Sequence, residues 1–226
     1  MGSLGIPYAV YDDVMKNRAP FFRAALAHAS KEALPRQIRL PQYHRDVFND
    51  CLDCIYQGLH EVFPDSLFAK DDDYRDQYHR LTQLHILANE LRDLRLCNDI
   101  CDYFISISVV EPYPEMITRI YSHFREKHLM RNFIMAVFMT QCDSDWLKKH
   151  RRSLPVDFIF DITLECRDAR TWMTGDAGVA DFNQHHGQQR KECYWHQHDK
   201  EVPQSECQAQ KKIANREGPG GGLDRE

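Results

Sequence analysis

The chain has 226 residues, of which 42% are hydrophobic and 28% are charged, and its formal net charge is −5. This acidic balance gives no reason to expect a nucleic-acid partner, because nucleic-acid binders usually present a basic surface. No apolar run approaches the ~20 residues needed to cross a bilayer, and residues 1–6 are too short for a signal peptide. We therefore expect a globular protein with one large domain or two small ones, and no membrane partner.

The spacing of the cysteines helps to predict the cellular compartment of the protein. Eight of them are spread at irregular spacings. Without a secretory signal, such cysteines are typical of reduced thiols and not of a disulfide framework. We expect an intracellular protein, cytoplasmic or nuclear.

Two short stretches near the N-terminus favour β-strands. Residues 7–11 (Pro-Tyr-Ala-Val-Tyr) are rich in residues with strand propensity, and residues 37–40 alternate polar and apolar before Pro41. The sequence therefore predicts a small sheet, which makes the fold class α+β but mostly helical.

Helices are predicted around these strands. Asp12 or Asp13 is suited to cap a short helix, and Pro20 suits the start of the next one. A third helix is predicted to open at Asp46, to bury one broad apolar face, and to end at Gly58.

The strongest pattern is a pair of amphipathic helices over residues 81–108. Leucines recur at three- or four-residue steps in the first helix: Leu81, Leu84, Leu87, Leu91 and Leu94. Cys97, Cys101 and Phe104 form one row in the second. The two helices are expected to meet near residues 92–95 and to supply the core, since burying one Leu or Phe is worth roughly 1.5–3 kcal/mol.

The rest of the chain divides by composition. Residues 109–167 are predicted to be a helical extension packed on the preceding part, without an independent domain boundary. Within it, residues 129–140 are apolar almost all round and should be buried on several sides, and residues 155–164 form a short helix. Residues 168–226 are rich in Gly, Gln and His, which indicates a flexible tail.

The order of these motifs resembles a known family. In chain order they are Val10-Tyr11-Asp12-Asp13-Val14-Met15, Pro20-Phe21-Phe22-Arg23-Ala24-Ala25-Leu26, Glu32, Ile38-Arg39-Leu40-Pro41, Val47-Phe48 and Cys54-Ile55-Tyr56-Gln57-Gly58, followed by the helix pair. Residues 7–108 resemble a BTB/POZ domain, whose members carry a Ser-Pro-Phe-Phe-like helix start and a Tyr-Thr-Gly-like helix end. Residues 84–98 and 155–158 are similar to the fungal BTB proteins.

Three departures from the family pattern stand out. Tyr11 replaces a frequent His, and Ala19 replaces a frequent Ser before the Pro-Phe-Phe motif. The family's N-terminal strand hairpin has no counterpart, because only six residues precede Pro7. Without that hairpin the two predicted strands lack a partner, and each buried unpaired amide costs roughly 1–3 kcal/mol. Either the chain is a truncated version of a longer protein or a partner strand rebuilds the sheet, and we favour truncation.

The resemblance implies a protein–protein interaction module and not an enzyme. BTB domains associate with themselves or with other BTB chains, and some are substrate adaptors for cullin-RING ubiquitin ligases. The positions that would contact partners by this resemblance are Asp13, Val14, Phe21, Phe22, Ser30, Glu32 and Tyr56. Glu32 matches the family's cullin-binding motif, but Ser30 stands where the family has an apolar residue. Homodimers should be weak or absent, because much of the family's dimer interface comes from the missing hairpin.

Two other functions remain open from the residues alone. Cys193, His196, His198 and Cys207 are zinc-ligand types, although their spacing is not that of a zinc finger, so a docking strand is favoured over a metal site. Four further cysteines lie on apolar helix faces, where cysteine is usually a small buried hydrophobe: Cys51, Cys54, Cys97 and Cys101.

After the interaction module and the zinc protein, the third alternative is a fragment of a longer protein without independent function. No catalytic motif or cofactor-binding loop is recognisable, so we expect no cofactor.

Overall fold

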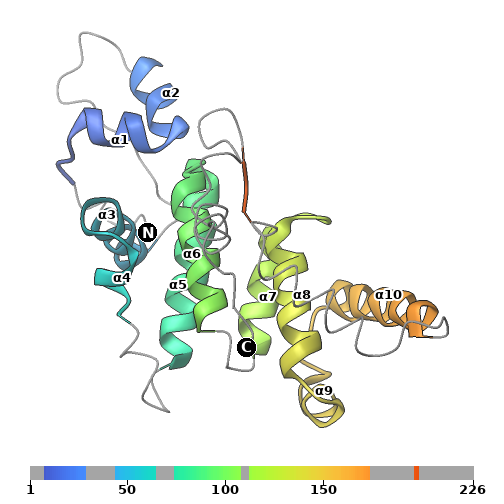
Figure 1. Ribbon diagram of the computed structural model, residues 1–226. Coiled ribbons are helices and arrows are strands. Elements are labelled where there is room, and N and C mark those ends of the chain that lie inside the picture. Colours follow the sequence, from blue (N-terminus) through green and yellow to red (C-terminus); the bar gives the residue numbers. More distant parts are fainter. Residues whose placement is uncertain (1–7, 29–43, 65–73, 108–111, 174–195, 199–226) are drawn as a thin grey trace, which may run out of the picture. The chain divides into compact units, whose positions relative to one another are not determined.

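The computed structural model describes residues 8–28, 44–64, 74–107, 112–173 and 196–198. These residues are mostly helical and include no β-strand (Figure 1). The chain divides into two compact units, residues 1–107 and 108–226, which are described separately. Among the helices with described residues, none is both long and apolar enough to cross a membrane.

The described part of the first unit is built from helices. They are α1 (Asp12–Arg18), α2 (Pro20–His28), α3 (Arg45–Gln57), α4 (Leu59–Val62), α5 (Tyr74–Leu91) and α6 (Leu94–Ser106). Helix α5 packs against α6, α3 and α2, while α1 packs against α2, and α4 against α3 and α6. Helix α5 therefore lies at the centre of this unit.

The core of the first unit confirms the predicted helix pair. Leu81, Leu84 and Leu87 of α5 are fully buried, and so is Cys97 of α6. Further buried side chains come from the surrounding helices: Phe22 and Leu26 of α2, Val47, Cys51 and Cys54 of α3, Leu59 of α4, Ile100, Cys101 and Phe104 of α6, and Phe63 after α4. The apolar stripes of α5 and α6 thus pack against each other and against helices on both sides.

A two-residue turn joins α5 to α6 and contains Asp93, the most buried carboxylate among the described residues of the unit. Arg92 adopts a positive φ of 57°, which ends α5, and Asp93 follows with only 1% of its surface exposed. Asp93 Oδ1 accepts a hydrogen bond from the Leu96 backbone N at 3.0 Å, which caps α6. Asp93 Oδ2 accepts a second one from Arg18 Nε of α1 at 2.8 Å. One carboxylate therefore starts α6 and also anchors α1.

The predicted small sheet is not seen among the described residues. Residues 8–11 form no strand and instead lie along α3, where the Tyr8 hydroxyl donates to Asn49 Oδ1 at 2.7 Å. The Tyr8 ring packs against Phe48 of α3, and no strand of the described ranges pairs with this backbone. The second predicted strand, residues 37–40, lies outside the described residues.

The helix ends match the predictions in part. Gly58 ends α3 as predicted, with a φ of 96° that favours glycine. The predicted cap of α1 is wrong, because Tyr11 occupies the cap position without a side-chain hydrogen bond. Asp12 and Asp13 lie in the first turn instead, where acidic groups interact favourably with the helix dipole. Helix α3 begins one residue earlier than predicted and is capped by the His44 side chain, which accepts a hydrogen bond from the Asp46 backbone N.

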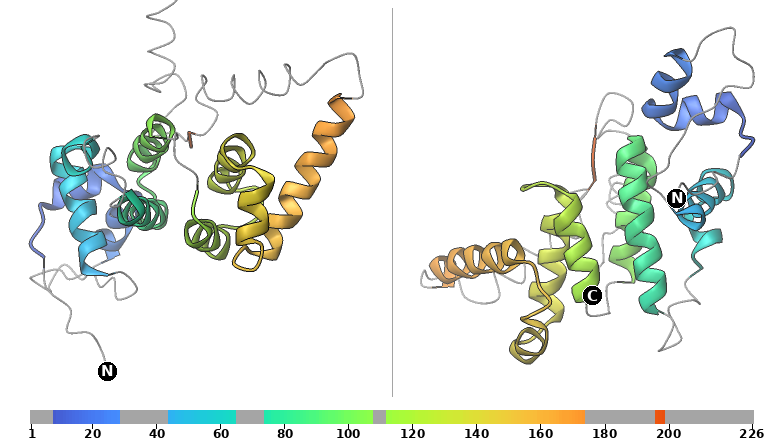
Figure 2. Two further views of the ribbon diagram at one scale, coloured as in Figure 1. Left: turned by 90° about the horizontal axis from the view of Figure 1, so that it is seen from below. Right: turned by 180° about the vertical axis from the view of Figure 1, so that it is seen from behind.

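The second unit contains α7 (Pro114–His123), α8 (Leu129–Gln141), α9 (Ser144–His150) and α10 (Val156–Met173). Helix α8 packs against α7 and α10, and α7 also contacts α10 (Figure 2). The strongly apolar helix predicted over residues 129–140 is confirmed as α8, whose buried apolar side chains are Met130, Phe133, Ile134, Val137 and Phe138.

Helix α10 is longer than the sequence pattern indicated. The predicted helix ended at Leu164 and the predicted tail began at Asp168, but α10 continues to Met173. The physical reason is local: residues 165–173 contain neither Gly nor Pro, and the next Gly in the chain is Gly175. A change in overall composition did not mark the end of the helix.

A buried polar chain joins three helices of the second unit. Arg131 of α8 donates from Nη2 to the Tyr121 carbonyl oxygen at 2.6 Å, and its guanidinium carbon lies 4.4 Å from the centre of the Tyr121 ring. The Tyr121 hydroxyl of α7 donates to Asp161 of α10 at 2.8 Å. These contacts set the register of α7, α8 and α10 against one another.

Replacing Arg18 with Met should destabilise the first unit strongly. The buried Asp93 carboxylate then loses its cation, and such an unpaired buried charge costs about 3 kcal/mol or more in free energy of unfolding. Lys16→Met on the same helix is the matched control, because it removes only a surface pair with Asp12 at 3.1 Å and should cost less than about 1 kcal/mol. Urea unfolding followed by circular dichroism measures both variants. Equal losses would contradict a special role for the buried pair.

The second unit should lose stability in mild acid through His128. Its Nδ1 caps α8 by accepting from the Met130 backbone N at 3.1 Å, which requires that nitrogen to be unprotonated. Burial lowers the pKa of His128, with further lowering from His123 and Arg131. Because the folded pKa is depressed, the unfolded chain binds more protons below about pH 6.5, so the free energy of unfolding falls as the pH falls.

The test compares His128→Asn, which keeps a capping group that does not titrate, with His123→Asn at the end of α7. Tryptophan emission reports on this unit, since all three tryptophans follow residue 108. Between about pH 7.5 and pH 5.5, His128→Asn should lose less stability than the unsubstituted chain. His123→Asn should keep most of the dependence. Parallel pH profiles for the His128 variant and the unsubstituted chain would refute the role of His128.

Candidate protein-binding surface

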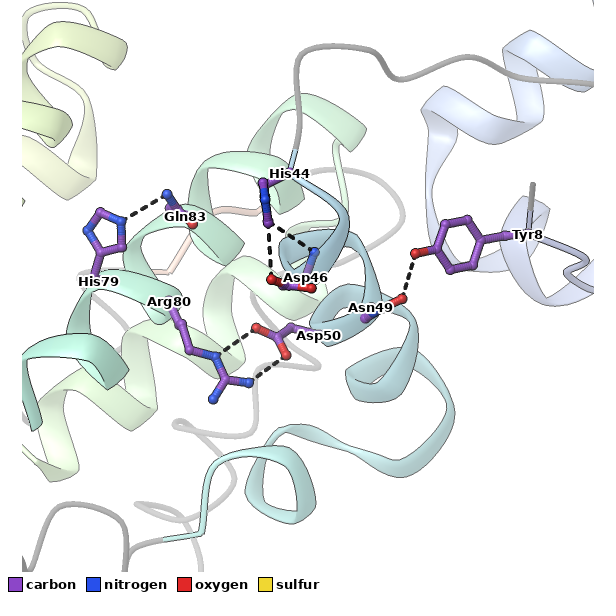
Figure 3. Close-up of polar contacts among 8 residues, drawn as sticks. All are labelled: Tyr8, His44, Asp46, Asn49, Asp50, His79, Arg80 and Gln83. Carbon is purple, nitrogen blue, oxygen red and sulfur yellow. Dashed lines mark hydrogen bonds and ion pairs between the residues drawn. The ribbon is translucent and has the colours of Figure 1, made fainter. Parts of the chain in front are cut away.

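Three exposed tyrosines lie where residues 8–11 pass α3 in the first unit. Tyr11 is 76% exposed, Tyr56 47% and Tyr8 36%. The Tyr11 backbone N donates to the Tyr56 hydroxyl at 3.4 Å, and the Tyr8 hydroxyl is bound to Asn49 (Figure 3). We call Tyr8, Tyr11 and Tyr56 the tyrosine surface.

The contacts show that residues 8–11 run alongside α3 in the same direction. Tyr8 is bound at Asn49, and Tyr11 is bound at Tyr56. Seven residues of helix rise about 10.5 Å, and three steps of extended chain cover about 10–11 Å, so the two segments match in length. The Tyr8 ring also packs edge-on against Phe48 at a centroid distance of 5.0 Å. The Tyr8 side chain and the Tyr11 backbone are therefore held on the helix.

Helix α3, which carries this surface, is held on α5 by a bidentate ion pair. Arg80 Nη2 lies 2.6 Å from Asp50 Oδ1, and Arg80 Nε lies 3.1 Å from Asp50 Oδ2 (Figure 3). Asp50 is buried, and the guanidinium carbon of Arg80 lies 5.0 Å from the centre of the Phe63 ring. The hydrogen bond that Arg80 donates to Asp50 raises the pKa of Arg80, which stays charged. Two hydrogen bonds between one guanidinium and one carboxylate fix the orientation of the two groups as well as the distance between them.

Acidic side chains flank the tyrosine surface. Asp12 and Asp13 lie in the first turn of α1, directly after Tyr11, and Asp53 is exposed on α3 one turn before Tyr56. Of these, Asp12 is paired with Lys16 across one turn. The arrangement places aromatic rings beside a negatively charged border.

The structure distributes the predicted partner-binding residues over several environments. Asp13 is exposed and Val14 is half-buried next to the tyrosine surface, to which Tyr56 belongs. Phe22 is buried in the core, and Phe21 is half-buried, with its ring 5.4 Å from that of Phe22. Ser30 and Glu32 lie outside the described residues.

Sequence reasoning does not select Tyr8 and Tyr11 for this surface. It attributes their aromatic character to a strand, and it marks Tyr11 only as a departure from the family's His. The density of tyrosine in residues 7–11 is the available signal. It cannot show that these residues pair with α3, about 40 positions further along the chain.

The four cysteines predicted to be core side chains are buried, which confirms that prediction. Burial raises the pKa of Cys54 and Cys101 to about 12, and it also raises the pKa of Cys51 and Cys97. These thiols therefore stay protonated at neutral pH and are poor nucleophiles, although Cys101 Sγ lies 3.8 Å from His85 Nε2. The described ranges contain no group of three or more His, Cys, Asp or Glu side chains placed to hold a metal ion.

The C-terminal zinc alternative is only half within the described residues. His196 is buried and His198 is half-buried, with ring centroids 6.1 Å apart. Cys193 and Cys207, the two thiol candidates, lie outside the described residues. The zinc alternative therefore stays a hypothesis from the sequence.

Comparison with known proteins adds nothing to these observations, since no family model, curated protein or solved structure matches the chain. The tyrosine surface and its rigid support are therefore the observations of the first unit that bear most directly on function. Aromatic rings such as these are also enriched at protein interfaces.

Native alkylation should separate the cysteines by environment. At about pH 7.5, iodoacetamide should modify the exposed Cys166 and leave Cys51, Cys54, Cys97 and Cys101 unmodified until the chain is unfolded in urea. Peptide mapping by mass spectrometry reads each site. Cys166→Ser serves as the assignment control. Modification of Cys101 in the folded chain at the rate of Cys166 would show that the thiol is reactive beside His85, contrary to our expectation.

Proposed function

We propose that the chain is a protein–protein interaction module and that the tyrosine surface is where its first unit binds another polypeptide. The observation that carries the proposal is that Tyr8 and Tyr11 are hydrogen-bonded to α3, which carries Tyr56, with Tyr11 exposed by 76%. Tyrosine is enriched at binding hot spots, because its ring buries a large area and its hydroxyl stays hydrogen-bonded. No catalytic role is proposed.

The rigidity of the surface supports this proposal. Single exposed aromatics are common and need no special reason, but Tyr56 belongs to α3, and the Tyr8 hydroxyl and the Tyr11 backbone N are hydrogen-bonded to that helix. Each tyrosine has few rotatable bonds, so ordering it on binding costs little conformational entropy. The Asp50–Arg80 ion pair keeps α3 in place. A surface that is already ordered loses less free energy on association than a flexible one.

The family resemblance suggests the type of partner. We propose a BTB/POZ-type scaffold that associates with another chain, with a cullin-RING ubiquitin ligase adaptor as one specific form. Within this proposal, hetero-association is favoured over a stable homodimer. Ser30 in place of an apolar residue weakens the case for cullin, because a buried contact is lost.

Site-specific photo-crosslinking tests where the partner binds. A benzophenone amino acid replaces Tyr11 or Tyr56 in the full chain, expressed in its native cells, and Asp76, exposed on α5, is the control position. We expect Tyr11 and Tyr56 to capture one shared protein that the Asp76 position does not capture. Identical captures from all three positions, or none, would overturn the assignment of the surface.

The captured protein, once purified, permits a quantitative test. Tyr11→Ser should weaken its binding by about tenfold or more, as expected for a hot-spot residue, while Asp76→Ser should leave it unchanged. Both positions are exposed, so thermal unfolding by circular dichroism should be similar for the two variants. Unchanged binding by Tyr11→Ser and Tyr56→Ser alike would count against the proposal.

Two further measurements separate the specific forms of the proposal. A pull-down with a purified cullin N-terminal domain at micromolar concentration decides the adaptor role, which a negative result removes. Light scattering at low micromolar concentration should report a monomer. A stable dimer would contradict the expectation of weak homo-association.

A further inference from the structure

Helix α10 of the second unit has one apolar face buried and a second apolar row exposed. Phe158 and Ile162 are buried in the core that α10 shares with α7 and α8. On the outer side, Val156 is 83% exposed, Phe160 61% and Leu164 43%. These three residues are four positions apart, so they form one continuous row along the helix. Scattered exposed hydrophobics are ordinary, whereas a continuous row marks a contact surface.

The two edges of this row differ in charge. Asp157 and Asp161 follow Val156 and Phe160 in sequence and lie along one edge, where Asp157 is exposed and Asp161 accepts the hydrogen bond from Tyr121 at 2.8 Å. The opposite edge carries Ile159 and Thr163, which have no charge. At its C-terminal end, the row meets the exposed Arg167. The face is therefore apolar in the middle and acidic on one side.

We infer that this row is a docking site for an amphipathic helix of another protein, whose apolar residues cover Phe160 and whose Lys or Arg side chains lie along the edge of Asp157 and Asp161. An apolar stripe at four-residue spacing is the surface on which a helix packs through its own i, i+3 and i+4 residues. The charges of the acidic edge select a basic partner. This site is separate from the tyrosine surface, which belongs to the first unit.

Charge also argues against a second copy of this chain as the occupant. Two α10 helices packed face to face and antiparallel about a twofold axis place their acidic edges against each other, and like charges at that spacing repel. A parallel pair sets each acidic edge against the edge of Ile159 and Thr163, which carries no cation opposite Asp157 or Asp161, since Arg167 continues that edge only at its C-terminal end. A basic helix satisfies the acidic edge, which neither symmetric arrangement does.

The test uses two fluorescent peptides of about the length of α10, which has 18 residues. Both carry the same leucine stripe at i, i+3 and i+4 spacing; one has Lys at the flanking positions and the other has Glu. Fluorescence anisotropy with the full chain should show at least about tenfold tighter binding of the Lys peptide. Phe160→Ser should weaken this binding by about tenfold, and Asp157→Lys should reduce or reverse the preference for Lys over Glu.

Matched controls show whether the peptide binds at this row of α10 and not elsewhere on the chain. Phe160 and Asp157 are exposed, so both variants should keep the helical circular dichroism and the unfolding midpoint of the unsubstituted chain. Tyr11→Ser should leave peptide binding unchanged, which separates this proposal from that for the tyrosine surface. Equal binding of the two peptides, no binding of either, or binding unaffected by Phe160→Ser would overturn the inference. Self-association of the chain that Phe160→Ser abolishes would instead identify a second copy as the occupant.

Discussion

The buried carboxylate of Asp93 is the group on which the arrangement of the first unit depends. Its two oxygens have different tasks, because one accepts the Leu96 backbone N–H at the start of α6 and the other accepts Arg18 of α1. Removing a carboxylate from water is costly unless it is paired and hydrogen-bonded. Burial accordingly raises the pKa of Asp93, and Arg18 opposes that rise. The same buried carboxylate therefore couples the start of α6 to the attachment of α1.

This constraint reaches the proposed binding surface through α1. A helix of seven residues is not stable on its own, so its position follows from what holds its ends. Arg18 is held at one end by Asp93, and Tyr11 at the other by the hydroxyl of Tyr56. The tyrosine surface thus depends on a buried ion pair at the opposite end of the same short helix. A loss of that pair should disturb binding without touching a tyrosine.

How much of the structure was predictable depended on the range of each interaction along the chain. The α5–α6 pair followed from leucine spacing, and the end of α3 from Gly58, because both are local signals. The strand expected at residues 7–11 failed because strand-forming aromatics pack equally well against a helix, and the partner of Tyr8, Asn49, is 41 positions away. The sequence did not single out the outer row of Val156, Phe160 and Leu164 on α10, because their spacing does not show which face of that helix is covered, whereas burial does.

The most direct measurement of the central claim is a double-mutant cycle between Arg18→Met and Asp93→Asn. Asparagine keeps a side-chain oxygen to cap α6 but carries no charge that needs Arg18. We therefore predict that Asp93→Asn restores part of the free energy of unfolding lost in Arg18→Met, so that the two substitutions are strongly non-additive. Losses that simply add would contradict the claim, because they would show that the Asp93 carboxylate and the Arg18 guanidinium act independently.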